Sequence, residues 1–157
     1  MKIDDNSAKV SFPPPLVYIG FLLVGLVIDR ILGLTGFGLP MAFRVACAAF
    51  FAFTGIALIV AGVGRFRSAG TPPEPWREVT ALVTTGVYRF TRNPMYLGMA
   101  AIHIGIAFGM DSISALVLLA VVIMVIRTQV IAREEVYMAR TFGATYSDYC
   151  KRVRRWF

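Results

Sequence analysis

The sequence predicts an all-α integral membrane protein with about four transmembrane helices, the last two forming a tight hairpin, followed by a C-terminal amphipathic helical segment. Hydrophobic residues make up 57% of the 157-residue chain and charged residues only 16%, too few to cover the surface of a soluble domain. The mean hydropathy is +0.69. Long uncharged runs interrupt the charged residues, and the length allows about four spans of roughly 20 residues each within a single domain.

The first two predicted spans lie in the N-terminal half. Residues 10–28 contain no charge, and we expect the first helix to begin just after the three prolines at 13–15, which suit a helix entry. Asp29, Arg30 and the glycine-rich residues 33–38 predict its end. Residues 45–64 form a second uncharged run long enough to cross a membrane.

A basic loop is expected to follow at residues 65–75, because arginines, glycine and prolines cluster there. The short apolar piece at residues 81–85 cannot span a membrane and is expected to be a re-entrant or surface segment.

The last two spans are expected at residues 93–110 and 112–126, which are uncharged apart from Asp111 between them. Both runs are short, so we predict a tight hairpin that turns at residues 109–112. The fourth helix could extend through residues 129–132 if Arg127 faces protein or water instead of lipid.

Beyond Arg133 the pattern becomes amphipathic, since apolar and aromatic residues alternate with arginines and Lys151. This pattern predicts a surface helix with a cationic face, interrupted near Gly143.

The positive charges predict the orientation in the membrane. With four spans, 14 of the 16 lysines and arginines lie on the side of the two termini, and only Arg30 and Arg44 lie opposite. Basic residues collect on the cytoplasmic side, so we expect both termini and the functional site in the cytoplasm, at the inner (plasma) membrane if the source is bacterial. The net charge of +7 is thereby explained without a nucleic-acid partner.

Residues 86–96 carry more hydrogen-bonding chemistry than a membrane turn needs. They include two tyrosines, two arginines and an asparagine, and Pro94 leaves the backbone before the third span open to a polar ligand. The alternative is an ordinary helix entry, with Asn93 as its cap and the arginines and tyrosines as interfacial anchors.

Glu134 and Glu135 follow the fourth span and should return to the same membrane face. Arg127 lies seven residues before Glu134, which would place both side chains on one side of an α-helix. The alternative is a solvated surface turn neutralised by Arg133 or Arg140.

Other candidate residues have structural explanations. His103 lies in mid-span without a second ligand and is expected to make a hydrogen bond between helices. Gly62 with Gly64, and Gly105 with Gly109, predict close helix packing. The two cysteines, Cys47 and Cys150, have neither a disulfide pattern nor a metal-ligand spacing, so no metal is expected.

Three separate motifs together resemble one enzyme family. They are Gly86-Val87-Tyr88-Arg89 with Arg92-Asn93-Pro94-Met95-Tyr96-Leu97-Gly98, then Glu134-Glu135, then Phe142-Gly143-Ala144-Thr145-Tyr146-Ser147-Asp148-Tyr149 with Val153 and Arg154-Arg155-Trp156. Their order and spacing over residues 82–157 resemble the membrane methyltransferases typified by isoprenylcysteine carboxyl methyltransferase and the phospholipid methyltransferases.

The resemblance implies an enzyme that binds S-adenosylmethionine on the cytosolic side, between the last two spans and the C-terminal segment, and takes a lipidic acceptor from the bilayer. Residues 1–80 would then supply the N-terminal spans and the basic loop, and residues 81–157 the cofactor-binding half. By position, the cofactor-binding residues would be Tyr88, Arg92, Asn93, Tyr96 and Glu135, the catalytic residues Glu134 and Arg127, and the lid residues Tyr146 and Tyr149.

Two departures from the family pattern bear on this expectation. Many relatives have histidine where this chain has Asn93, and asparagine does not titrate near neutrality, so it suits cofactor binding better than proton transfer. Isoprenylcysteine-specific members have an arginine at the position of Val130, which weakens the case for an isoprenylcysteine carboxylate.

Several functions therefore stay open at this point. The acceptor could be an isoprenylcysteine-like carboxylate, a thiol or another lipidic group, or alternatively the amine of a phospholipid. The chain could also be a non-catalytic scaffold or transporter that contacts membrane lipids or a partner through its basic C-terminal helix. The sequence does not define the oligomeric state.

Overall fold

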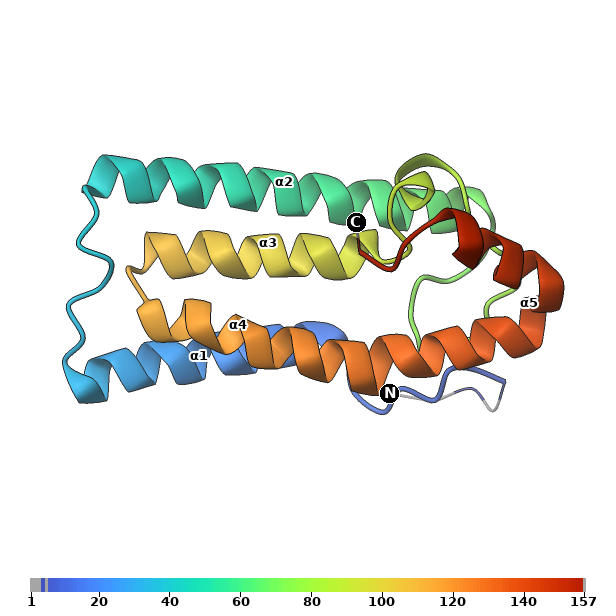
Figure 1. The fold of residues 1–157 in the computed structure, drawn as a ribbon, viewed down its shortest axis with the longest axis horizontal. Helices are drawn as coiled ribbons and strands as arrows, with labels where there is room; N and C mark the ends of the chain where they lie inside the picture. The colour runs from blue at the N-terminus through green and yellow to red at the C-terminus, as the bar shows by residue number, and fades with distance from the viewer. Residues whose placement is uncertain (1–3, 5, 157) are drawn as a thin grey trace.

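The computed structural model describes residue 4 and residues 6–156, and its regular elements are all helical (Figure 1). In chain order they are α1 (Pro14–Leu32), α2 (Met41–Ser68), the 3-10 turn η1 (Gly86–Arg89), α3 (Pro94–Gly109), α4 (Ile113–Val125), the π-helical turn η2 (Ile126–Ile131) and α5 (Ala132–Arg152). The predicted all-α class is confirmed.

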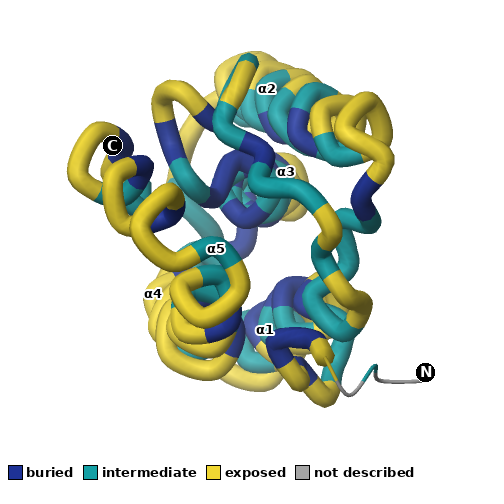
Figure 2. Tube along the Cα trace, turned by 90° about the vertical axis from the view of Figure 1, so that its right-hand side faces the viewer, coloured by how far each residue is buried: buried dark blue, intermediate teal, exposed yellow. Residues whose placement is uncertain are grey.

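The helices α1 to α4 run side by side, and α3 lies at the centre. Seen from the end of the bundle, α3 is mostly buried, whereas α1, α2 and α4 turn exposed faces outward (Figure 2). The main helix pairs are α2 with α3 and α1 with α4.

The exposed faces are apolar, as expected of helices in contact with lipid. Three helices are long and apolar enough to cross a membrane: Pro14–Leu32, Met41–Ser68 and the continuous helix Ile113–Arg152, while α3 is apolar but shorter. Large side chains such as Phe50, Phe53 and Val117 are more than half exposed. The chain is an integral membrane protein.

Two predicted helix ends were wrong. Helix α1 starts within the prolines as expected, but it continues past Asp29 and ends at Gly33, which adopts a left-handed conformation (φ 62°). Asp29 can stay in the helix because α4 supplies donors: the Ser112 hydroxyl and the Ser114 backbone N–H at 3.2 Å. Helix α2 continues to Ser68, so Arg65 lies on its last turns and not in a loop.

The predicted hairpin between the last two spans is confirmed. Helix α3 ends at Gly109, Asp111 adopts a positive φ of 58°, and the Ser112 hydroxyl caps α4 by accepting from the Ala115 N–H at 3.1 Å. The Asp111 carboxylate also accepts from the Phe37 N–H at 3.0 Å and pairs with Arg44 at 2.8 Å. One aspartate therefore ties together the two turns at this end of the bundle.

Glycines bring α2 and α3 into close contact. A Cβ on Gly98 would lie 2.6 Å from the Gly55 carbonyl oxygen, and one on Gly105 would lie 2.9 Å from the Ala48 carbonyl oxygen. Gly62 packs against Met95 as expected, but Gly64 faces open space, so the predicted packing role of Gly64 was wrong. Only glycine allows the backbones to approach this closely.

His103 makes the expected interhelical hydrogen bond. Its Nε2 lies 2.9 Å from the Ala115 carbonyl oxygen, which joins α3 to α4 in the buried interior.

Helix α4 and the C-terminal helix are continuous. The π-helical turn η2 connects α4 to α5, and Gly143 (φ 52°, ψ −125°) then bends α5 back toward the bundle (Figure 1). The predicted interruption at Gly143 is confirmed, and the bend returns the C-terminal residues to the entry of α3.

Candidate active site

The two segments that the sequence singled out meet at one end of the bundle. The Tyr96 hydroxyl, on the first turn of α3, donates a hydrogen bond of 2.6 Å to Glu134 Oε1 on the first turn of α5. This end also carries the C-terminal residues, while the α1–α2 connection and the hairpin turn lie at the opposite end (Figure 1).

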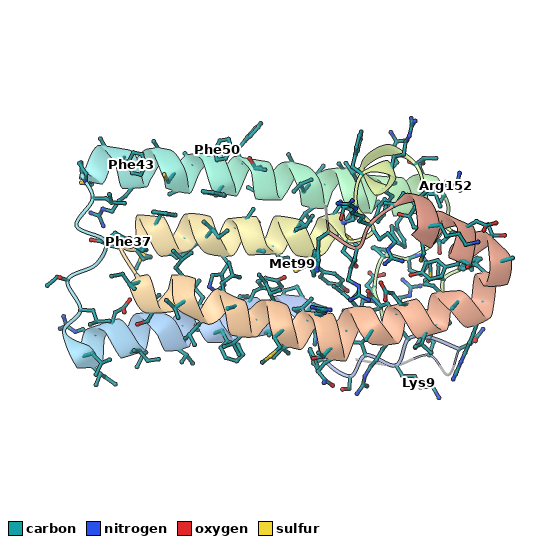
Figure 3. All side chains as sticks on the ribbon, viewed as in Figure 1. Lys9, Phe37, Phe43, Phe50, Met99 and Arg152 are labelled. Carbon is teal, nitrogen blue, oxygen red and sulfur yellow. The ribbon has the colours of Figure 1, made fainter. Side chains whose placement is uncertain are left out.

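A cavity of about 790 Å³, counted with its open mouth, surrounds this contact. Its lining comes from the N-terminal arm, the end of α2, the loop before η1, the entry of α3 and one face of α5. Figure 3 shows many side chains gathered at this end of the bundle, between the labels of Met99 and Arg152.

Eight of the nine predicted site residues line this cavity: Tyr88, Arg92, Asn93, Tyr96, Glu134, Glu135, Tyr146 and Tyr149. The lining also takes Phe66, Pro73 and other residues from the first 80 positions, so both halves of the chain contribute.

Arg127 is the predicted site residue that the structure leaves elsewhere. It is exposed on η2, outside the described lining of the cavity. The seven-residue spacing to Glu134 would align the two side chains only on a regular α-helix, and the wider π-helical turn breaks that alignment.

Glu134 carries the least compensated negative charge of the site. Its hydrogen-bond donor is Tyr96, and no lysine or arginine among the described residues forms an ion pair with it. Tyr96 itself is buried and held by Tyr18, whose hydroxyl donates to the Tyr96 carbonyl at 3.0 Å. Burying an unpaired carboxylate is costly, so a positive group in the cavity would be stabilised beside it.

Glu135 has the opposite arrangement, because two arginines hold it. Arg155 makes two hydrogen bonds to its carboxylate, at 3.0 and 2.6 Å, and Arg92 approaches within 3.1 Å. The Glu135 carboxylate raises the pKa of the Arg155 guanidinium further above its usual value. Glu135 therefore braces the wall of the cavity.

The C-terminal residues are fastened to the entry of α3. The Arg92 N–H donates to the Arg154 carbonyl at 3.0 Å, and the Arg155 carbonyl accepts from the Thr91 hydroxyl at 3.1 Å and from Asn93 Nδ2 at 3.0 Å. Asn93 occupies the N-cap position of α3, as the alternative interpretation expected, but its side chain makes no capping hydrogen bond and its amide binds the C-terminal residues.

Three polar atoms of residues that line the cavity are buried without a hydrogen-bond partner among the described residues: the donors Tyr88 hydroxyl and Arg92 Nε, and the acceptor Glu74 Oε2. Burial, and next the nearby Glu134 charge, raise the pKa of the Tyr88 hydroxyl, so it stays a neutral donor. The Tyr88 carbonyl accepts from the Tyr149 hydroxyl at 2.7 Å, which fixes the tyrosine. Such unsatisfied donors fit a polar ligand.

Two functional residues escaped the sequence analysis. Arg155 was noted only as part of a motif, although it pairs with Glu135. Tyr137 lines the cavity and accepts from the Val79 N–H at 3.0 Å, which anchors the loop before η1. Its position three residues after Glu134, on the same helix face, was an available signal.

The described residues contain no cluster of three or more histidine, cysteine, aspartate or glutamate side chains that could hold a metal ion.

Comparison with known proteins gives a consistent result. A family model described as phospholipid methyltransferase matches residues 43–145, more than half of the chain. A protein-S-isoprenylcysteine O-methyltransferase of Schizosaccharomyces pombe is 32% identical over 72 residues, which cover 46% of this chain and 30% of that relative. The chain thus aligns with less than a third of that longer protein. No solved structure matches.

Proposed function

The chain belongs to the phospholipid methyltransferase family, and from that premise we propose that it transfers a methyl group from S-adenosylmethionine to a small acceptor resident in the membrane. The observation that carries the proposal is the Tyr96–Glu134 pair, a carboxylate without a cationic partner among the described residues in a cavity rich in tyrosine.

The residues of the cavity fit this cofactor. A sulfonium cation is stabilised by a carboxylate and by aromatic rings, and Glu134, Tyr96 and Tyr88 offer both. The unsatisfied Tyr88 hydroxyl and Arg92 Nε can bind polar groups of the nucleoside or the amino acid. When bound, S-adenosylmethionine supplies an electrophilic methyl group.

The protein's contribution is mainly alignment and exclusion of water. Methyl transfer requires the acceptor atom, the methyl carbon and the sulfur to be in line. The protein can therefore accelerate the reaction by holding the two reactants in this geometry. Tyr146 and Tyr149 form the lid wall on α5, and the Glu135 ion pairs keep this wall against the entry of α3.

Within this function, the charges favour a phospholipid amine over a carboxylate as the acceptor. Arg92 is paired with Glu135, and Arg77 lies 4.0 Å from Glu74, so the lining arginines already have acidic neighbours. Glu134 by contrast can accept at its carboxylate the proton that an amine must lose. An isoprenylcysteine-like carboxylate or a thiol is the competing acceptor.

We further propose four spans, with both termini and the cavity in the cytoplasm. The distribution of lysine and arginine supports this orientation. Helix α3 is only about 24 Å long at 1.5 Å per residue, but it can serve as the fourth span because neighbouring helices cover it. Labelling of single cysteines placed next to Arg30 and next to Asp148, in intact vesicles, tests the orientation; equal labelling from one side contradicts it.

Calorimetric binding of S-adenosylhomocysteine to the detergent-purified chain tests the cofactor. The wild type should bind one equivalent and Tyr96→Phe should weaken the binding, whereas Glu134→Gln should weaken binding of S-adenosylmethionine more than binding of this neutral-sulfur product. Asp148→Asn, an acid-to-amide change on the exposed face of α5, is the matched control and should bind like the wild type. Absence of saturable binding by the wild type would remove the cofactor proposal.

Incubation of membranes with methyl-labelled S-adenosylmethionine tests the acceptor. Label in the lipid fraction supports an amine or other lipidic acceptor, and label in the protein fraction supports an isoprenylcysteine-like group. Binding without any labelled product would instead support a non-catalytic scaffold or transporter.

A further inference from the structure

A second hollow lies outside the cavity and is lined by residues of η1 and of the C-terminal end of α2, two elements that contact each other. This open groove is lined by Ala61, Gly64, Arg65, Ser68, Gly86, Val87, Arg89 and Phe90. Its charged residues are two arginines, and no acidic residue is part of the described lining.

Neither arginine of the groove is neutralised by an acidic side chain among the described residues. Arg65 and Arg89 are exposed, and neither forms an ion pair or a side-chain hydrogen bond with any described residue. Arg92 and Arg155, at the same end of the bundle, are engaged by Glu135. The groove therefore contains two guanidinium groups that stabilise no other described part of the structure through an ion pair or a side-chain hydrogen bond.

The backbone shapes the groove for Arg65. Gly86 has a positive φ of 62°, and a Cβ at this position would collide with the Arg65 guanidinium at Nε. The positive φ favours glycine in this turn, and the missing Cβ lets the Arg65 side chain lie across it.

One edge of the groove is apolar and exposed. Phe90, next to Arg89, is 79% exposed, and Val87 and Ala61 continue the apolar edge. Arginines beside an exposed aromatic ring, at the end of a transmembrane helix, match the chemistry of the headgroup region of a bilayer.

We propose that this groove binds the phosphate of an anionic phospholipid headgroup, with Arg65 and Arg89 as the ligands and Phe90 at the acyl chains. The C-terminal end of α2 carries partial negative charge and would repel an anion, so the binding must depend on the two arginines. The groove shares no described lining residue with the cavity, whose wall includes Phe66 and Tyr88 with their ring centroids 5.5 Å apart. The inference rests on the membrane location and not on methyl transfer.

The test is lipid retention by the full chain. Protein reconstituted with equal amounts of phosphatidylglycerol and phosphatidylcholine is released into detergent, and retained lipids are counted by native mass spectrometry. The wild type should retain phosphatidylglycerol roughly tenfold in preference, since each arginine adds to the attraction. The double change Arg65→Gln with Arg89→Gln should bring the preference close to parity.

Two control variants separate the groove from general surface charge. Arg67→Gln removes an exposed arginine of the same helix that lies outside the groove lining, and it should keep the preference. The double change Arg65→Lys with Arg89→Lys keeps both positive charges and should retain most of the preference for phosphatidylglycerol. This variant distinguishes loss of charge in the glutamine variant from a folding defect. Equal loss in Arg67→Gln, or no preference in the wild type, would overturn the proposal.

Inorganic phosphate, titrated by calorimetry in lipid-free detergent, distinguishes the source of the phosphate. Saturable binding that is lost in the double glutamine variant supports the phosphate site and indicates that a free phosphate can fill it. Retained phosphatidylglycerol without phosphate binding supports the site and indicates that the acyl chains are required.

Discussion

The two ends of the bundle use carboxylates in different ways. At the end with the hairpin turn, Asp111 pairs with Arg44 and accepts from Phe37, and Asp29 accepts from Ser112 and Ser114. At the cavity end, Glu135 is equally well held, but Glu134 accepts from Tyr96 alone among the described residues. Carboxylates with several partners stabilise turns and the cavity wall, whereas a carboxylate with a single hydrogen-bond donor retains the capacity to bind a cation.

The largest effect is expected for Glu134→Gln, which removes that carboxylate. Methyl transfer should fall about 100-fold, the usual scale for loss of one electrostatic contact at a reacting centre. Affinity for S-adenosylmethionine, which is cationic at sulfur, should fall about tenfold, whereas affinity for neutral-sulfur S-adenosylhomocysteine should change little. Calorimetry with both ligands measures the difference. Equal losses for both would show that Glu134 has only a structural role.

Glu135→Gln should act on stability more than on chemistry. It leaves Arg92 and Arg155 without their carboxylate, and because the groups are partly exposed we expect a loss of about 2 kcal/mol in the free energy of unfolding. Thermal unfolding in detergent measures it. Glu74→Gln, at the 4.0 Å pair with Arg77, is the matched control and should stay within about 0.5 kcal/mol. Similar losses in both would contradict the bracing role.

Tyr96→Phe removes the hydroxyl donor but keeps the ring. Turnover should fall about tenfold, which corresponds to roughly the free energy of one hydrogen bond to a charged group. Tyr18→Phe removes a different hydrogen bond to the same residue, at its carbonyl, and should reduce turnover less. A larger loss in Tyr18→Phe would mean that the position of α3 matters more than the hydroxyl on Glu134.

The smallest effect is expected for Asp111→Asn at the opposite end. Asparagine tolerates the positive φ, so the change removes mainly the charge facing Arg44 and should cost about 1 kcal/mol of unfolding free energy. Labelled methyl incorporation should equal that of the wild type. A fall in turnover as large as that of Tyr96→Phe would contradict the independence of the two ends.

The sequence was a good guide wherever one segment determined its own structure. Uncharged runs predicted the four helices, Asp111 with its neighbours predicted the hairpin, and Gly143 predicted the bend. Residues 86–96 and the glutamate pair were predicted to meet, and Tyr96 contacts Glu134. The helices, the hairpin and the bend follow from local composition, because helix length and turn chemistry are local properties, whereas the meeting of the two segments followed from the membrane topology and the family resemblance.

The features that escaped prediction depend on partners far along the chain. Asp29 stays helical because Ser112, 83 positions later, lies beside it, and the Asn93 side chain at the N-cap of α3 binds the Arg155 carbonyl and not the helix backbone. Arg127 lies outside the cavity because of the π-helical turn, and the apolar sequence around this turn does not predict it.

That π-helical turn sets the direction in which α5 faces. A π-helical turn holds one residue more than the α-helical turn it replaces, so this segment absorbs an extra residue without changing the direction of the helix beyond it. Loss of one residue between positions 126 and 131 should therefore restore regular winding with little rotation of α5, whereas loss of one residue from a regular α-helix would turn everything downstream by about 100°. Deletions should accordingly be tolerated better in this segment than in the regular turns of α4 before it.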